Sequence, residues 1–213
     1  MELSVQEIRN AAAAQRVIKA LEMRHMEGYF AATKAEALKK ALELILEGSS
    51  VGWGGCRSAE EIGLIEAVCS GNYAELDRSK AASQKERYEI MNRCLTADWF
   101  IMGTNAITED GQLVNLDGMG NRVAALCYGP RKVLIIAGMN KLVRSVEDAV
   151  SRTRHTAAPI NATRFDIDTP CKQTGVCGDC LKDGCICSQL VITRNCKPNG
   201  RIKVILVGEA LGF

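Results

Sequence analysis

Apolar residues recur at helical spacing in several stretches of the chain, and this pattern predicts amphipathic helices. The first helix is expected over residues 4–24. Its apolar stripe comprises Val5, Ile8, Ala12, Val17 and Leu21. Residues 34–47 predict a second helix, because Thr33 can cap its start and Glu36 stands where a capping box requires an acid. Further helices are expected from Ser58, over residues 79–94, over residues 121–127 and from Ser145.

Short apolar runs between these helices predict strands. They cover residues 28–32, 50–53, 98–103, 112–116, 132–138 and 201–207. Because strands that alternate with helices usually build a parallel sheet, the chain is expected to be an α/β protein with a mostly parallel sheet flanked by helices. We expect a single domain over residues 1–213, with a cysteine-rich, metal-binding segment, residues 171–196, inserted before the last strand.

Length and charge narrow the class of protein. The chain has 213 residues, of which 47% are hydrophobic, enough for one sizeable core. Its formal net charge of +2 gives no electrostatic argument for nucleic acid. No run approaches the roughly 20 apolar residues of a membrane span, and the N-terminus lacks the basic start and apolar core of a signal peptide. We therefore expect a cytoplasmic protein that binds neither nucleic acid nor membrane.

The late cysteines carry the clearest chemical signal. Six of the ten cysteines crowd into one short segment: Cys171, Cys177, Cys180, Cys185, Cys187 and Cys196. In a reducing compartment such a cluster indicates metal binding before disulfides. The C-x2-C step lets two thiolates from one tight turn meet the same metal. Because four ligands are required, we predict that Cys171, Cys177, Cys180 and Cys187 bind, with Cys185 as the competing fourth ligand.

Soft thiolate ligands suit either an iron–sulfur cluster or zinc. No histidine lies close to the cysteines, and their spacing is not the paired C-x2-C pattern of a zinc ribbon. We therefore favour an iron–sulfur cluster, of the 4Fe-4S type, over zinc. A zinc ion that only holds the loop, and free or oxidised thiols, remain the alternatives.

A glycine-rich turn joins the strand at residues 50–53 to the next helix. Gly54 and Gly55 allow a ligand to approach the backbone, the helix start offers free N–H groups, and Arg57 adds a cation for a carboxylate or phosphate. These three residues are candidate substrate-binding residues. The alternative is a tight turn packed under a helix.

A second polar turn follows the strand at residues 98–103, at the strand end where open α/β sheets bind ligands. Thr104, Asn105, Asn121 and Arg122 are candidate substrate-binding residues. Glu109 and Asp110 are candidate general bases. For Asp110, which precedes Gly111, a simple turn role is the stronger alternative.

Three stretches together resemble a known family. They are Gly54 to Gly63 (GGCRSAEEIG), Gly103 to Gly118 (GTNAITEDGQLVNLDG) and Gly120 to Ala125 (GNRVAA). The chain is similar to the LUD domain of lactate-utilization proteins, in a stand-alone subgroup with its own C-terminal cysteine motif. The resemblance implies the fold type shared by glucosamine-phosphate deaminase, ribose-phosphate isomerase and CoA transferases.

The same resemblance implies a role in redox metabolism of a small hydroxy or keto acid, such as oxidation of L-lactate to pyruvate, alongside iron–sulfur partner proteins. The chain would then be a subunit of a lactate-oxidising system. For its own oligomeric state, a homodimer is one option. Two other functions stay open. One is a non-redox enzyme of the isomerase or transferase type with a structural zinc. The other is a regulatory protein that binds a metabolite and reports it to a partner.

Overall fold

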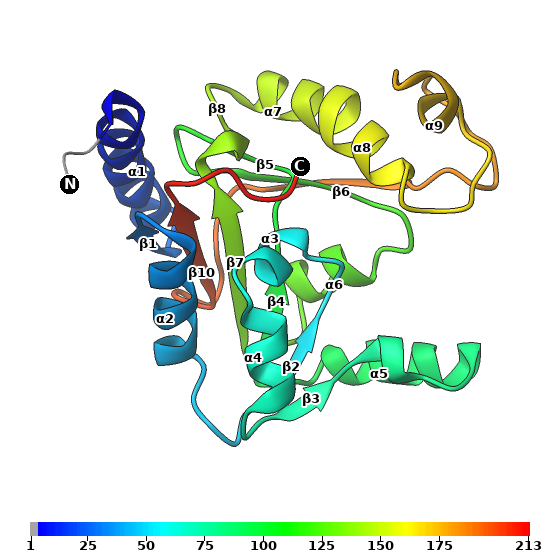
Figure 1. The fold of residues 1–213 in the computed structure, drawn as a ribbon, viewed down its shortest axis with the longest axis horizontal. Coiled ribbons are helices and arrows are strands. Elements are labelled where there is room, and N and C mark those ends of the chain that lie inside the picture. Colours follow the sequence, from blue (N-terminus) through cyan, green and yellow to red (C-terminus); the bar gives the residue numbers. More distant parts are fainter. Residues whose placement is uncertain (1–3) are drawn as a thin grey trace.

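The computed structural model describes residues 4–213 and builds them around a six-stranded sheet in which every strand pair is parallel (Figure 1). The first three residues of the expected domain 1–213 lie outside the described part. In sheet order the strands are β1 (Glu27–Ala31), β10 (Ile202–Val207), β7 (Lys132–Gly138), β4 (Trp99–Met102), β2 (Ser50–Trp53) and β3 (Ala74–Leu76). The prediction of an α/β fold with a mostly parallel sheet is confirmed.

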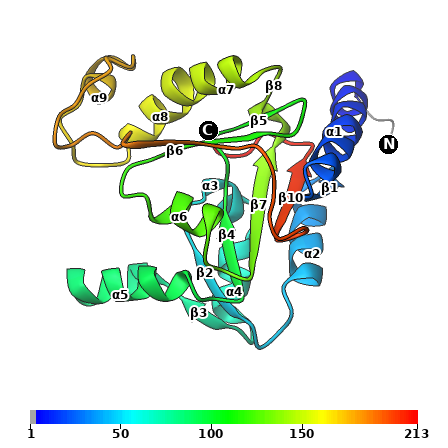
Figure 2. The same cartoon turned by 180° about the vertical axis from the view of Figure 1, so that it is seen from behind.

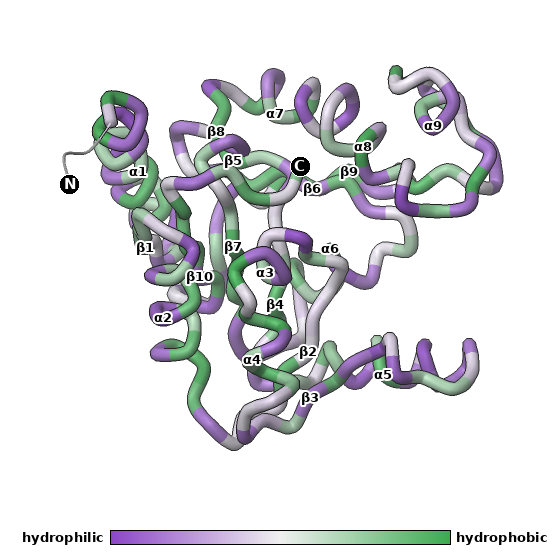
Figure 3. The backbone as a smooth tube through the Cα atoms, viewed as in Figure 1, coloured by the Kyte–Doolittle hydropathy of each residue, from purple (hydrophilic) through white to green (hydrophobic). Residues whose placement is uncertain are grey.

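The central strands are apolar along their whole length because both faces of the sheet are covered. In β7, Ile135 faces one hydrophobic cluster, whereas its neighbours Leu134 and Ile136 face the other. This alternation follows from the pleat, which points successive side chains to opposite faces. The hydropathy colours show apolar central strands and more polar outer helices (Figure 3).

Helices cover both faces of the six-stranded sheet (Figure 2). One face packs against α1 (Val5–Met23), α5 (Gln84–Cys94) and α6 (Asn121–Cys127). The other packs against α2 (Lys34–Leu44), α3 (Arg57–Glu61) and α4 (Leu64–Ser70). Apart from α1, which precedes β1, the helices that bury the sheet come from the connections between its parallel strands.

Helix α1 has the predicted extent, and Ser4 with Glu7 forms a capping box at its start. The predicted stripe is wrong at its first positions, because Val5 is 86% and Ile8 56% exposed. Ala12 is exposed too. The later positions of the stripe, Val17 and Leu21, are buried as predicted, and small residues such as Ala13 complete the buried face and permit close approach to the sheet.

A second, four-stranded sheet lies beside the first within the described residues. Its order is β8 (Leu142–Val143), β5 (Ala106–Thr108), β6 (Leu113–Asp117) and β9 (Gln189–Thr193). The sequence patterns did not predict β5 and β9. The strand β5 is three residues long among turn formers, and β9 leaves the cysteine-rich segment to pair antiparallel with β6. The end of the cysteine-rich segment is therefore part of the second sheet, in addition to lying between other elements along the chain.

Three helical segments follow β8: α7 (Val146–Arg152), the π-helical turn Thr153–Ala157 and α8 (Ala158–Ala162). They lead to α9 (Pro170–Thr174) and the cysteine loop. None of the helices between residues 4 and 213 combines the length and apolarity that a membrane span needs.

Three predicted helix boundaries differ from the structure. The helix expected over residues 79–94 begins only at Gln84, capped by Ser83, after a 3-10 turn over Arg78–Lys80. The helix expected from Ser58 begins one residue earlier, because Cys56 accepts the capping hydrogen bond from the N–H of Ala59. The helix expected over residues 34–47 ends at Leu44.

Arg201 ties β10 to the end of α6. Its buried guanidinium donates to the carbonyl oxygens of Pro130, Leu126 and Ala125 at 2.9, 2.7 and 2.6 Å. Arg201→Met leaves these carbonyls without a donor, so we expect it to lower the free energy of unfolding by about 3 kcal/mol in urea titrations.

Arg131→Met is the matched control, because the Arg131 side chain is 82% exposed and lies 3.6 Å from Asp98. It should change the free energy of unfolding by less than about 1 kcal/mol. Equal losses in the two variants would contradict the role given to Arg201.

Candidate functional site

The main cleft opens at the carboxyl ends of the parallel strands, where α/β sheets place ligands. It has a volume of about 770 Å³, within the range of small-molecule sites. Its walls come from the turns after β2 and β4, the start of α6, and Lys141 after β7. Residues of the α8 end, including Asn161 and Arg164, complete it.

The structure brings together all the residues predicted to bind substrate. The cleft is lined by Gly54, Gly55, Arg57, Thr104, Asn105, Asn121 and Arg122. They come from three separate turns of the sequence, and the parallel sheet gathers them because its strands end at one edge. Their contact with a substrate remains a prediction.

Arg122 is buried, and its guanidinium is engaged by the protein itself. One terminal nitrogen donates to Asn115 Oδ1 at 2.7 Å and to the carbonyl of Gly103 at 3.2 Å. The other donates to the carbonyl of Leu116 at 2.7 Å and to Asn105 Oδ1 at 3.1 Å. Arg122 therefore holds the walls of the cleft in place, and its role is positioning.

Asp117 and Gly54 complete the surroundings of this arginine. The Asp117 carboxylate lies 3.6 Å from Arg122 Nε and accepts hydrogen bonds from the first N–H groups of α6. Burial lowers the pKa of Arg122, and the negative charge of Asp117 opposes that shift. Gly54 has no side chain because a Cβ there would approach the Arg122 stem to 3.0 Å.

The polar groups of Thr104 and Asn105 also form hydrogen bonds within the protein. Thr104 Oγ1 donates to the carbonyls of Ala106 and Val114, which secures the start of the second sheet. Asn105 Oδ1 accepts from the N–H of Leu116 at 2.9 Å. Both side chains therefore shape the cleft.

The structure does not bring Glu109 and Asp110 into this cleft. They occupy the turn between β5 and β6, on the side of α1. Arg24 Nη2 lies 2.6 Å from the Asp110 carboxylate, and Arg16 lies 3.9 Å from Glu109. The turn chemistry of Asp110–Gly111, with Gly111 at a φ of 84°, accounts for this position. Neither residue lines the basic cleft, and a catalytic role for either one stays a prediction.

Lys141 and Ser58 were not predicted as site residues. Lys141 is only 4% exposed, and its Nζ donates to Ser58 Oγ at 3.0 Å. Burial lowers the pKa of Lys141 to about 8. Lys141 comes three residues after β7, at the edge of the sheet where ligands bind. This position could have identified it as a candidate site residue from the sequence.

The cleft carries an excess of positive charge. Its basic lining residues are Arg57, Arg78, Arg87, Arg122, Lys141 and Arg164. Its acidic lining residues are Glu60, Asp77 and Asp117. The walls of such a cleft raise the local concentration of anions.

The helix start beside the glycine turn offers little of the expected anion site. Helix α3 is only five residues long, and Cys56 Sγ accepts from one of its first N–H groups. Cys56 is itself buried, and burial raises the pKa of its thiol to about 11. The cations of the side chains, not a helix dipole, therefore give the cleft its charge.

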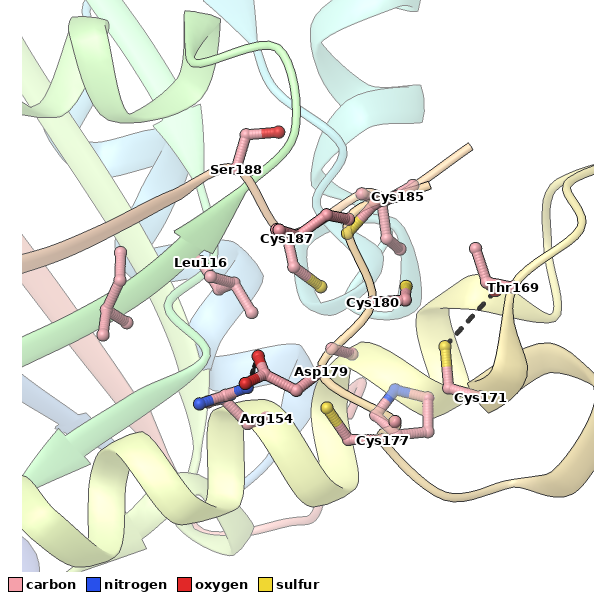
Figure 4. Close-up of a pocket in the computed structure, with 16 residues that line it drawn as sticks. Leu116, Arg154, Thr169, Cys171, Cys177, Asp179, Cys180, Cys185, Cys187 and Ser188 are labelled. Carbon is pink, nitrogen blue, oxygen red and sulfur yellow. Dashed lines mark hydrogen bonds and ion pairs between the residues drawn. The ribbon is translucent and has the colours of Figure 1, made fainter. Parts of the chain in front are cut away.

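A second, smaller cavity of about 190 Å³ is lined by five of the six late cysteines (Figure 4). They are Cys171, Cys177, Cys180, Cys185 and Cys187. Figure 4 shows their sulfur atoms distributed around this cavity. All four predicted ligands and the competing Cys185 are thus brought together.

The thiols are close enough to influence one another. Burial, and then the neighbouring thiols of Cys185, Cys171 and Cys177, raise the pKa of Cys187 to about 12. Arg154 lies beside Cys177 and pairs with Asp179. Within residues 4–213, however, no three His, Cys, Asp or Glu side chains are arranged to hold a metal ion.

Cys196, the sixth late cysteine, lies elsewhere. It is buried in the hydrophobic cluster beside α1, where its thiol donates to the carbonyl of Pro198 at 3.2 Å. It follows β9, which carries the chain away from the cysteine cavity. The expected segment 171–196 therefore places its last cysteine in the core.

The two cavities are neighbours. Leu116 and Ile186 line both of them. Ile186 stands between Cys185 and Cys187, so the cysteine loop forms part of the wall of the basic cleft. The loop 185–188 reaches this wall because Ser188 N–H donates to the carbonyl of Asp117, just before β9 pairs with β6.

These features define an α/β protein with a basic cleft at the carboxyl edge of a parallel sheet. The chain belongs to the LUD domain family, because the model of that domain matches residues 14–207. The match confirms the resemblance found in the sequence. No curated protein sequence matches the chain.

One solved structure is similar to the chain over nearly its whole length. The crystal structure of a DUF162 family protein from Deinococcus radiodurans is similar with a TM-score of 0.50 and 15% sequence identity. The likeness covers 97% of this chain and 99% of that chain. The crystal structure of eIF2B beta from Chaetomium thermophilum covers 52% of this chain and 43% of that chain, with 20% identity and a TM-score of 0.36.

Arg122→Leu tests the positioning network. It leaves the buried oxygens of Asn115, Gly103 and Leu116 without their donor, so we expect the free energy of unfolding to fall by about 3 kcal/mol. Urea titrations monitored by circular dichroism measure the loss.

The control is Arg57→Leu at another cleft residue. Arg57 is half-exposed and pairs with Glu60 and Glu61 on its own helix, at 3.3 and 3.1 Å. Its replacement should cost less than about 1 kcal/mol. If Arg122→Leu were no more destabilising than Arg57→Leu, the network would not hold the cleft.

Proposed function

We propose that this LUD-domain protein acts in redox-linked metabolism of a small hydroxy or keto acid, which it binds in the basic cleft beside an iron–sulfur cluster held by the cysteine loop. The observation that carries the proposal is the shared wall. Leu116 and Ile186 line both the cleft and the cysteine cavity, so a substrate and a redox centre would be neighbours.

The charge and size of the cleft support a small anionic substrate. The six basic side chains outnumber the three acidic ones. Arg78 lines the cleft, its Nη1 donates to the sulfur of Met91 at 3.7 Å, and a Cβ on Gly55 would lie 3.7 Å from its Nη2. A substrate carboxylate would find a charge-assisted partner in such a guanidinium.

The thiol side chains that line the cysteine cavity support a soft metal centre by their type, although their present positions do not group three of them around one point. Cys171, Cys177, Cys180 and Cys187 would hold it, and Cys185 is the competing fourth ligand. Thiolates without histidine suit an iron–sulfur cluster, which when bound would pass single electrons. The nearby guanidinium of Arg154 would offset the negative charge that four thiolates bring together.

The chain's own residues supply binding and orientation. Arg122, Asn105 and Thr104 fix the turns that form the cleft. The apolar side chains of Leu116 and Ile186 stand between the cleft and the thiols and would exclude water from that boundary. Lys141 and Ser58 provide a nitrogen and a hydroxyl at which a proton could be exchanged.

Metal analysis tests the redox centre. Protein purified without oxygen is expected to contain iron and acid-labile sulfide and to absorb visible light, with bleaching on reduction. The double variant Cys177→Ser/Cys180→Ser should lose most of the iron, because it replaces both ligands of the C-x2-C turn. Cys185→Ser and Cys187→Ser, measured side by side, identify the fourth ligand.

Cys69→Ser is the matched control, because Cys69 is exposed on α4, outside the cysteine loop. It should keep its iron. Zinc in place of iron and sulfide would overturn the redox proposal and favour the non-redox alternative with a structural metal.

Calorimetric titration with L-lactate and with pyruvate tests the substrate class. Arg78→Leu is expected to weaken binding by about ten- to a hundredfold, since a charge-assisted hydrogen bond contributes about 1.5–3 kcal/mol. Arg131→Met, outside the cleft, should bind like the unaltered protein. Failure of both acids to bind the unaltered protein would reject this substrate class.

A further inference from the structure

Lys141 lies in an unusual place for a lysine side chain. It follows the carboxyl end of the central strand β7, lines the basic cleft and is only 4% exposed. Lysine is almost never fully buried unless it has an anionic partner. The burial of this amine therefore requires an explanation.

No carboxylate lies within 4 Å of Lys141 Nζ among residues 4–213, and its hydrogen-bond acceptor is the neutral hydroxyl of Ser58 at 3.0 Å. Another buried lysine, Lys203, shows the usual arrangement. Its Nζ pairs with the carboxylate of Glu27. The Lys141 amine is thus held in the cleft without the partner that would keep it charged.

The groups around Lys141 come from several elements. Arg122 on α6 and Arg152 on α7 are positive and favour loss of its proton, after burial itself, which is the largest effect. Cys56 and Glu61 oppose that effect. The Glu61 carboxylate is engaged elsewhere, because it accepts from the N–H of Gly212 and from Arg57.

Two glycines pack close to the amine. A Cβ on Gly103 would lie 3.7 Å from Lys141 Nζ, and a Cβ on Gly212 would lie 3.3 Å from it. A Cβ on Gly212 would also approach Ser58 Oγ to 3.0 Å. A side chain at position 212 would therefore crowd the amine and the hydroxyl of Ser58, and both of these groups line the cleft.

We propose that Lys141 is a reactive amine that forms an imine with the carbonyl group of a 2-oxo acid bound in the cleft. This proposal rests on the proposed function and names the chemistry of its keto-acid form. A buried amine without a carboxylate partner, in a cleft rich in cations, suits a ligand that carries both a carbonyl and a negative charge.

The step balances without an oxidant. The lone pair of the neutral Nζ attacks the carbonyl carbon, and a C–N bond forms as the C=O bond is broken. The oxygen leaves as water with the two protons of the amine, and the C=N bond closes. The Ser58 hydroxyl, 3.0 Å from Nζ, is placed to relay a proton during this exchange.

Reductive trapping tests the proposal on the unaltered protein. Incubation with pyruvate and cyanoborohydride is expected to add one carboxyethyl group to the chain, which is pyruvic acid plus two hydrogens minus the water released, and peptide mapping should find it on Lys141. At pH 7 an amine with a pKa near 8 has a neutral fraction on the order of a hundredfold above that of an ordinary lysine. When imine formation limits the rate, trapping should accelerate as the pH rises from 7 towards 8, because the amine loses its proton, and should level off above that.

Three controls separate the outcomes. L-lactate, which lacks the carbonyl, should give no adduct, and Lys203 in the same digest should remain unmodified. Lys141→Arg keeps the charge but cannot form the imine, so it should give no adduct while it retains the circular dichroism spectrum of the unaltered protein. If Lys141→Arg does not fold, the peptide map of the unaltered protein still decides.

An adduct absent from Lys141, or spread over exposed lysines, overturns the proposal. Calorimetry with pyruvate in the absence of cyanoborohydride distinguishes this failure from failure of the proposed function. Binding without an adduct means that the amine only pairs with an anion, and the proposed function stands. Absence of both binding and adduct rejects the keto acid as the substrate class as well.

Discussion

The buried guanidinium of Arg122 connects the parts of the chain that surround the cleft. It donates to the turn after β4, to β6 in the second sheet and to Asn105, while its own helix begins on the carboxylate of Asp117. A buried charge is costly unless it is paired and fully hydrogen-bonded. Movement of any of these partners would leave the buried guanidinium with an unsatisfied hydrogen bond. The hydrogen bonds of Arg122 therefore stabilise the shape of the cleft.

The same constraint brings the two cavities together. Because β6 is held by Arg122, the strand β9 that pairs with it starts at a fixed position. The cysteine loop directly precedes β9, so Ile186 is placed against Leu116 in the common wall. Thiols and basic groups that lie far apart in the sequence thus meet across two apolar side chains.

Much of the fold could be predicted from local patterns. Continuous apolar runs such as residues 132–138 predicted buried strands, and Thr33 and Ser145 predicted helix starts that the structure confirms. The short β5 and the edge strand β9 could not be predicted in this way. Their strand character comes from pairing with β6, and pairing between distant segments leaves no local period in the sequence.

The sequence by itself determined the parallel α/β architecture, the glycine turns at its strand ends and the cysteine loop, since these depend on residue type and spacing. Only the tertiary structure decided that Glu109 and Asp110 face the arginines of α1, that Cys196 joins the core, and that Lys141 is buried beside Ser58. The physical reason is that burial and electrostatic environment depend on which distant segments pack around a side chain.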